Sequence, residues 1–213
     1  MDVGIVSAIA SLHQLLPAGI EVQGTKTDFS IPAVQIEDSP RFEWRGFMLD
    51  ASRHFWNKDE VKHVLDLMSL YKLNKFHWHL TDDQAGASRS AHSQSSRSLP
   101  PMRPFSNFGR SMEYGPHGGY YTKSDIREIV AFCAERHITV IPEIEMPGHA
   151  SALLSAYPEY SCDGKPVAVK TRGGVYADTL CAGKEETYAA LEAILMEVME
   201  LFPGKQIHLG GDE

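Results

Sequence analysis

Four short apolar segments alternate with helical patterns along this chain, and this alternation constrains the fold more than any other feature. Polar residues follow each apolar segment, as they would follow a buried strand. The four segments are residues 44–50 (WRGFMLD), 74–80 (NKFHWHL), 137–145 (HITVIPEIE) and 206–209 (QIHL). Strands that alternate with helices predict a parallel sheet with crossover helices, and therefore an α/β fold.

Three helices are expected between these strands. Asn57, with Glu60 three residues later, is a good helix start. Thr122 is a good N-cap for a second helix, with Asp125 in its first turn. A long third helix is expected over residues 185–202, before Pro203-Gly204. The apolar positions at helical spacing are Val61, Val64, Leu65, Met68; Ile126, Ile129, Val130, Cys133; and Leu191, Ile194, Leu195, Val198.

Polar and charged residues gather directly after each predicted strand, at 50–54, 81–84, 143–149 and 212–213. Chemistry that comes from the carboxyl end of every strand favours a β/α barrel. A doubly wound open sheet would concentrate its ligand at one switch point, and no dinucleotide or phosphate loop follows any strand. A complete barrel has eight strands, of which we count four. Residues 41–213 are therefore predicted to form a partial (β/α)8 TIM barrel, about the first four β/α units.

The first 40 residues have a different pattern. Residues 1–17 lack a basic n-region, and their apolar residues fall at helical rather than continuous spacing, which favours a helix from a preceding domain over a signal peptide. The location stays undetermined by the sequence; a periplasmic or extracellular one is the working interpretation, with the signal region missing from this chain.

Composition excludes some classes of partner. The net charge of -8 argues against a nucleic-acid surface, which needs clustered Lys and Arg. No apolar run approaches the ~20 residues of a membrane span. Of the three cysteines, Cys133 is expected as a buried thiol. Cys162 and Cys181 flank a Gly-rich loop and could pair in an oxidising compartment, although spacing alone does not decide this.

The pair Asp212-Glu213 follows a predicted buried strand and two glycines. Adjacent carboxylates on a surface are usually just solvated. Here Gly210 and Gly211 let the backbone turn sharply or approach a ligand closely. Like charges held together in a partly dry site give a protonated acid beside an ionised carboxylate, which is the equipment for acetal cleavage.

Two further candidates lie at the predicted strands. His149 is near Glu143 and Glu145; a lone histidine is often structural, and a catalytic role is equally open here. Arg45 is predicted within the first strand, where a charge needs a partner. It is either in an ion pair with Asp50 or a fork that donates to vicinal sugar hydroxyls.

A metal-dependent hydrolase is the runner-up, because His77 and His79 form a His-x-His pair at a predicted strand end. His77, His79, His149 and Asp212 would be its ligands. Against this alternative, alternate residues on a barrel strand point inward and can simply fill the interior.

Four sequence blocks resemble glycoside hydrolase family 20 together and in the family's order. They are RGFMLDASRHF (45–55), HWHLTDD (77–83), GGYYTKSDIREIVAFCAERHITVIPEIEMPGH (118–149) and IHLGGDE (207–213). The members of that family are exo-acting β-N-acetylhexosaminidases. The resemblance runs from about residue 40 to the end with one gap, and residues 1–40 resemble the end of the small α+β domain that precedes the family's barrel.

The resemblance implies a role for each candidate residue. Glu213 would be the general acid, and Asp212 would orient the substrate's 2-acetamido group, whose carbonyl oxygen attacks the anomeric carbon. Arg45 would bind sugar hydroxyls, while Asp82 and His149 would tune the acid through a hydrogen-bonded chain. No cofactor and no metal are implied. The implied substrate is a carbohydrate with a terminal β-linked N-acetylhexosamine, and homodimerisation of the complete protein stays open.

Residues 85–110 depart from the family pattern. They are rich in Ser, Arg and Pro, carry no acid and show no periodicity, so a long flexible loop is expected. The family usually continues after Gln84 with Gly-Trp-Arg-Ile-Glu-Ile. Loss of one base from a plausible coding sequence for those residues yields the Ala-Gly-Ala-Ser-Arg-Ser observed at 85–90. We hypothesise a frameshift that is compensated near Met112.

The end of the chain is the second departure. The family's later barrel strands supply aromatic residues that enclose the N-acetyl group, and the sequence stops before them. The chain alone is therefore expected to be inactive. A non-catalytic sugar-binding relic is the alternative function.

Overall fold

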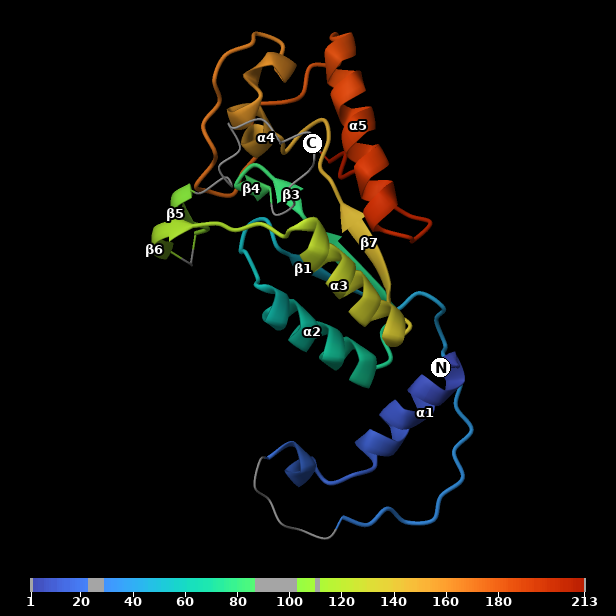
Figure 1. Ribbon diagram of the computed structural model, residues 1–213. Helices are drawn as coiled ribbons and strands as arrows, with labels where there is room; N and C mark the ends of the chain where they lie inside the picture. Colours follow the sequence, from blue (N-terminus) through green and yellow to red (C-terminus); the bar gives the residue numbers. More distant parts are fainter. Residues whose placement is uncertain (1, 23–28, 87–102, 110–111, 213) are drawn as a thin grey trace.

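The centre of the molecule is a parallel sheet of three strands in the order β1-β2-β7 (Figure 1). In this computed structural model, the structure describes residues 2–22, 29–86, 103–109 and 112–212. The strands are β1 (Gly46–Asp50), β2 (Lys75–His79) and β7 (Thr139–Glu143). Asp50 pairs with His79, and His79 pairs with Glu143. This register brings the carboxyl ends of all three strands to one edge, as predicted.

The segment predicted as a fourth strand lies parallel to β7. The His208 backbone N–H donates to the carbonyl of Pro142 (2.9 Å), and its carbonyl accepts from Ile144 N–H (3.0 Å). The Leu209 carbonyl accepts from Met146 N–H (3.0 Å). The contact is an isolated bridge between Glu143 and His208 rather than a regular strand. It nevertheless carries the chain to the same edge as the other three carboxyl ends.

Helices α2 (Lys58–Leu70), α3 (Lys123–Glu135) and α5 (Glu185–Leu201) confirm the three predicted helices. Figure 1 shows α2 and α3 side by side against the sheet. Both predicted caps are complete. Asn57 accepts from the Glu60 backbone N–H while the Glu60 side chain accepts from Asn57 N–H, and Thr122 and Asp125 make the same reciprocal pair. Each cap satisfies two N–H groups that the first turn would otherwise leave without partners.

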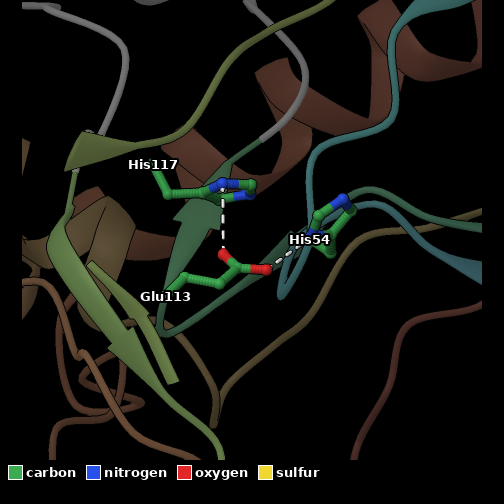
Figure 2. A group of neighbouring side chains, drawn as sticks. All are labelled: His54, Glu113 and His117. Atoms are coloured by element: carbon green, nitrogen blue, oxygen red, sulfur yellow. Dashed lines mark hydrogen bonds and ion pairs between the residues drawn. The ribbon is translucent and has the colours of Figure 1, made fainter. Parts of the chain in front are cut away.

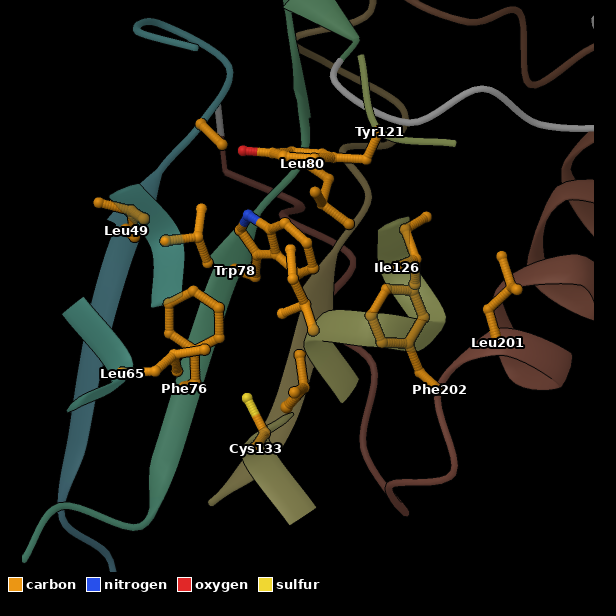
Figure 3. Packing of buried hydrophobic residues seen from close by; sticks show 14 of the residues in the cluster. Leu49, Leu65, Phe76, Trp78, Leu80, Tyr121, Ile126, Cys133, Leu201 and Phe202 are labelled. Atoms are coloured by element: carbon orange, nitrogen blue, oxygen red, sulfur yellow. The ribbon is translucent and has the colours of Figure 1, made fainter. Parts of the chain in front are cut away.

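The core lies between the sheet and these helices (Figure 3). Alternate residues of β2 point to opposite faces, so Phe76 and Trp78 point toward the helices and are fully buried. Trp78 packs edge-on against Tyr121, with ring centroids 4.7 Å apart. Full burial of each such apolar side chain contributes about 1.5–3 kcal/mol. The buried helix positions that meet the sheet are Val61, Leu65, Met68, Ile126, Ile129, Cys133, Val198 and Leu201.

The N-terminal segment contains helix α1 (Val3–Gln14) and the short 3-10 helix η1 (Ala18–Glu21), which confirms a helix near the start. Gln14 donates from Nε2 to the Leu70 carbonyl at the end of α2 (2.7 Å). The assignment of residues 1–40 to a separate domain stays a prediction. Within the described ranges, no helix combines the length and the apolar character that crossing a membrane requires.

Residues 85–110 are not entirely irregular, which corrects the expectation for part of them. Strand β5 (Arg103–Asn107) pairs antiparallel with β6 (Met112–His117), and β3 (Thr81–Asp82) pairs with β4 (Ala85–Gly86). Arg103 is fully buried; it donates to the Ser106 hydroxyl (2.6 Å) and to the Arg53 carbonyl. These partners explain why a polar segment packs. Residues 87–102 lie outside the described residues, and the frameshift stays a hypothesis.

The loop from β7 to α5 contains α4 (Ser151–Ala156), the 3-10 helix η3 (Pro158–Tyr160) and a disulfide. Cys162 and Cys181 are bonded, so the pairing left open by the sequence is confirmed. Cys133 is a buried free thiol, also as predicted, and burial raises its pKa to about 12.

Candidate active site

Acids and histidines from every strand converge at the carboxyl edge of the sheet. Asp82 is almost completely enclosed there, with 1% of its surface exposed. Its Oδ2 lies 2.5 Å from Arg53 Nη2 and 3.3 Å from His79 Nε2. A buried carboxylate needs such cationic and hydrogen-bonding partners, because burial without them would cost several kcal/mol. Asp82 is therefore held in position by Arg53, from the segment after β1, and by His79 of β2.

His149 connects the buried acids with an exposed one. Its Nδ1 lies 3.3 Å from Asp82 Oδ1 and 3.0 Å from Asp83 Oδ2, while its Nε2 lies 3.6 Å from Asp212 Oδ2. Burial opposes a positive charge on the ring, but the two neighbouring carboxylates outweigh it and raise the pKa of His149 above its ordinary value. Three predicted site residues, Asp82, His149 and Asp212, are thus brought together.

Asp83 is a functional candidate that the sequence analysis did not single out. Its side chain is buried, and Oδ1 accepts from the backbone N–H (3.0 Å) and hydroxyl (2.6 Å) of Ser151. These bonds leave Oδ2 facing His149. Asp82 and Asp83 are adjacent in sequence, so the sequence does not show that they contact different residues. The structure does.

Glu145 is the acid of this site whose pKa departs most from its ordinary value. Burial, then the charges of Asp212 and Glu143, raise its pKa to about 7, with His79 acting in the opposite direction. The His79 Nε2 lies 3.4 Å from Glu145 Oε1. A carboxyl group that exchanges protons near neutral pH is suited to acid–base work. The sequence analysis placed Glu145 beside His149 but gave it no role of its own.

Gly210 makes room for Glu145. A Cβ added at Gly210 would overlap the Glu145 carboxylate, and the φ of +66° also favours glycine. Gly211 has a φ of +77°. Both glycines therefore adopt backbone conformations that other residues rarely adopt, directly before the acidic pair. Asp212 is largely exposed at its end, and Glu213 lies outside the described residues.

Arg45 is not part of this site. It precedes β1 instead of lying inside it, and its guanidinium donates to the carbonyls of Lys72 (2.7 Å) and Phe42 (2.7 Å) at the amino end of the sheet. Neither its expected position nor the ion pair with Asp50 is observed. Arg53 is the guanidinium at the carboxyl edge, with donors to Asp50 Oδ2 (3.2 Å) and Gln84 Oε1 (3.1 Å). The polar run 50–54 after the predicted strand was the available signal for it.

The histidines of β2 have different neighbours from those of the metal alternative. His77 Nε2 lies 2.6 Å from Glu143 Oε2, and its ring stacks on His208 with centroids 4.8 Å apart. His79 lies among Asp82 and Glu145 instead. Among the described residues, no group of potential ligands unites His77, His79, His149 and Asp212.

Fold and site together define an α/β protein with a cluster suited to acid–base chemistry at the carboxyl edge of a parallel sheet. Residues 42–213 match the family model "Glycosyl hydrolase family 20, catalytic domain". The chain belongs to this family.

Curated relatives and solved structures agree with this assignment. The chain is 39% identical to the β-hexosaminidase of Porphyromonas gingivalis over 211 residues. This alignment covers 99% of the chain and 26% of that protein. The GH20 β-N-acetylhexosaminidase of Streptomyces coelicolor A3(2) matches with a TM-score of 0.87 and 40% identity over 98% of the chain and 41% of that structure. A mutant Streptomyces plicatus β-hexosaminidase in complex with its product GlcNAc matches with a TM-score of 0.86 and 37% identity. This match covers 98% of the chain and 40% of that structure. The chain thus spans 26% to 41% of the length of these relatives.

Proposed function

We propose that the protein carrying this chain is an exo-acting β-N-acetylhexosaminidase that removes terminal N-acetylglucosamine or N-acetylgalactosamine by substrate-assisted, retaining hydrolysis. Family membership and the product GlcNAc in the Streptomyces plicatus relative support this function. The observation that carries it furthest is the position of His149, between the buried acids Asp82 and Asp83 and the exposed Asp212.

We also infer that residues 41–213 form the first four β/α units of a (β/α)8 barrel, after the end of an α+β domain at 1–40. The parallel order β1-β2-β7 and the bridge from Glu143 to His208 support this architecture, because successive strands lie side by side. In such barrels the chemistry occurs at the carboxyl ends of the strands, where the acids of this chain gather.

In this proposal Glu213 protonates the glycosidic oxygen, and Asp212 orients and polarises the 2-acetamido group of the substrate. The acetamido carbonyl oxygen forms a bond to the anomeric carbon as the bond to the leaving oxygen breaks. Water then opens the oxazolinium intermediate, and the configuration is retained. Adjacent carboxylates suffice, because neither has to reach the opposite face of the sugar ring.

The remaining residues position these two acids and the sugar. Asp82 and Asp83 fix the His149 ring through Nδ1, so that Nε2 is directed to the acidic pair. Arg53 takes the role that the sequence interpretation gave to Arg45. Its planar set of donors suits vicinal hydroxyls, and its side chain is one-third exposed at this edge.

The test is hydrolysis of β-N-acetylglucosaminides by the full-length protein and its Glu213→Gln variant. Loss of a general acid typically lowers kcat by about 10²–10⁴-fold. The loss should be large for an alkyl leaving group and small for a dinitrophenyl one, which departs without protonation. Asp59→Asn, an exposed carboxylate on α2, is the matched control and should leave both rates unchanged.

Two results would overturn this function. Equal loss with both leaving groups would remove Glu213 from the role of acid, and a product of inverted configuration would exclude the acetamido nucleophile. If the protein binds N-acetylglucosamine in a titration but hydrolyses no β-N-acetylhexosaminide, the non-catalytic sugar-binding alternative holds instead.

A further inference from the structure

A second group of histidines and a carboxylate lies outside the candidate active site. Figure 2 shows His54, Glu113 and His117 pointing toward one another. His54 follows β1, whereas Glu113 and His117 belong to β6, so segments about 60 residues apart in sequence supply the group. None of the three has a role in the proposed hydrolysis. We call them the hairpin cluster.

The spacing within the hairpin cluster is that of ligands around one ion. His54 Nδ1 lies 3.2 Å from Glu113 Oε1, and His117 Nδ1 lies 3.4 Å from Glu113 Oε2. Metal bonds of about 2.0–2.1 Å in a tetrahedron place neighbouring donor atoms about 3.3–3.4 Å apart. All three ligand atoms lie within 4.8 Å of one another. The three ligand atoms therefore lie close enough to gather around one ion, once His117 gives up the hydrogen bond that its Nε2 now accepts.

Neighbouring rings contact the partly exposed side chain of His54. The His54 ring packs against Trp56 and His117, with centroids 4.7 and 4.8 Å apart. Glu113 Oε2 is buried and accepts no hydrogen bond of normal geometry. A cation at this position would give this oxygen a better partner than the His117 Nδ1, which lies 3.4 Å away.

We propose that His54, Glu113 and His117 bind a divalent transition-metal ion of the zinc type. Two imidazoles and a carboxylate are suitable donors for Zn²⁺, and a fourth position is left to water. Such an ion would join β6 to the loop after β1, which also carries Arg53. It would strengthen the link that Arg103 already makes by donating to the Arg53 carbonyl. The ion would thus link two segments beside the candidate active site.

Metal binding must rearrange one proton. The His117 Nε2 accepts a hydrogen bond from the Phe55 backbone N–H (3.0 Å), so the neutral ring carries its proton on Nδ1. For Nδ1 to bind the ion, that proton moves to Nε2 and the bond from Phe55 is given up. The net charge of the ring does not change. At constant pH, the Phe55 amide is therefore expected to respond when the hairpin cluster binds an ion.

The experiment titrates the full-length protein with Zn²⁺ alone, and with Co²⁺ for its visible absorption in tetrahedral sites. Glu113→Gln and His117→Gln keep size and polarity but remove a ligand. Each should weaken binding by at least about 10–100-fold, the loss known for merely outer-shell partners. Circular dichroism and Tm without metal establish that each variant is folded.

Two control variants make the result specific. His63→Gln changes an exposed histidine of α2 and should leave the affinity for Zn²⁺ unchanged. His208→Gln disrupts the separate group of His77, Glu143 and His208 and should also leave it unchanged. Addition of Zn²⁺ should shift the Phe55 amide resonance in the wild-type protein. Absence of binding, or loss of binding in His208→Gln with affinity retained in Glu113→Gln, would overturn the proposal.

Discussion

Arg45 and Arg53 lie at opposite ends of the same strand, β1, and their guanidinium groups bind different kinds of acceptor. Arg45, at the amino end of β1, directs its guanidinium to the carbonyls of Lys72 and Phe42. Arg53, beyond the carboxyl end, faces the carboxylates of Asp50 and Asp82. Neutral acceptors at one end hold the backbone together. Charged acceptors at the other end create a polar, partly exposed surface that is available to a ligand.

Strand direction explains this difference. In a parallel sheet all carboxyl ends lie at one edge, so acids that follow β1, β2 and β7 accumulate there. The amino edge receives only the chain that returns from each helix, and its polar side chains close those connections. We therefore expect changes at the carboxyl edge to alter chemistry and changes at the amino edge to alter stability alone.

The largest expected effect comes from a matched pair, Arg53→Lys and Arg45→Lys. Lysine keeps the positive charge but lacks the planar set of N–H donors of arginine. A lost hydrogen bond between charged groups costs about 1.5–3 kcal/mol. In Arg53→Lys, kcat/KM for an aryl β-N-acetylglucosaminide should fall by roughly 10–150-fold. In Arg45→Lys it should stay within about twofold, while the Tm falls by a few degrees. Equal losses of kcat/KM in the two variants would abolish the distinction between the edges.

Glu145 gives the next largest effect, measured as stability against pH. Its folded-state pKa of about 7 exceeds the ordinary value of 4.5, so the folded protein favours the neutral carboxyl. This contribution is fully present below about pH 4.5 and is lost as the pH rises through about 7, at most about 3 kcal/mol. Glu145→Gln stays neutral. It should match the wild type near pH 4.5 and be more stable at pH 8.

Urea unfolding at the two pH values measures this difference. Glu37→Gln, in an exposed segment far along the chain from the site, is the control and should not change the pH dependence. If Glu145→Gln has the same stability relative to wild type at pH 4.5 and pH 8, the carboxyl does not titrate in this range. The attraction of His79 would then offset burial and the charges of Asp212, Glu143 and Asp82 around Glu145.

Local signals in the sequence were sufficient for the helices. Asn57 with Glu60, and Thr122 with Asp125, predicted both caps because each pair satisfies its own backbone groups within four residues. The strand segments were also found, although β1 begins only at Gly46. That small error in a boundary placed Arg45 inside the strand, whereas its guanidinium lies at the amino end of the sheet.

Long-range partners could not be predicted in the same way. Burial of Arg103 depends on a carbonyl 50 residues away, at Arg53, and no local pattern reveals such an acceptor. The partners of Asp82 and Asp83 also come from distant segments. The sequence therefore indicated which residues gather at the carboxyl edge, but not which of them contact one another.

The smallest expected effect concerns Asn74 at the amino edge. Its Oδ1 accepts from the Arg45 backbone N–H (2.9 Å), and its Nδ2 donates to the Glu43 carbonyl (2.8 Å). Asn74→Ala removes both bonds, and each contributes about 0.5–1.5 kcal/mol. We expect a loss of about 1–3 kcal/mol in urea unfolding. The kcat and KM of the folded fraction should not change. A fall in kcat with unchanged stability would show that the amino edge also acts on the chemistry, and would end the separation between the two ends of the sheet.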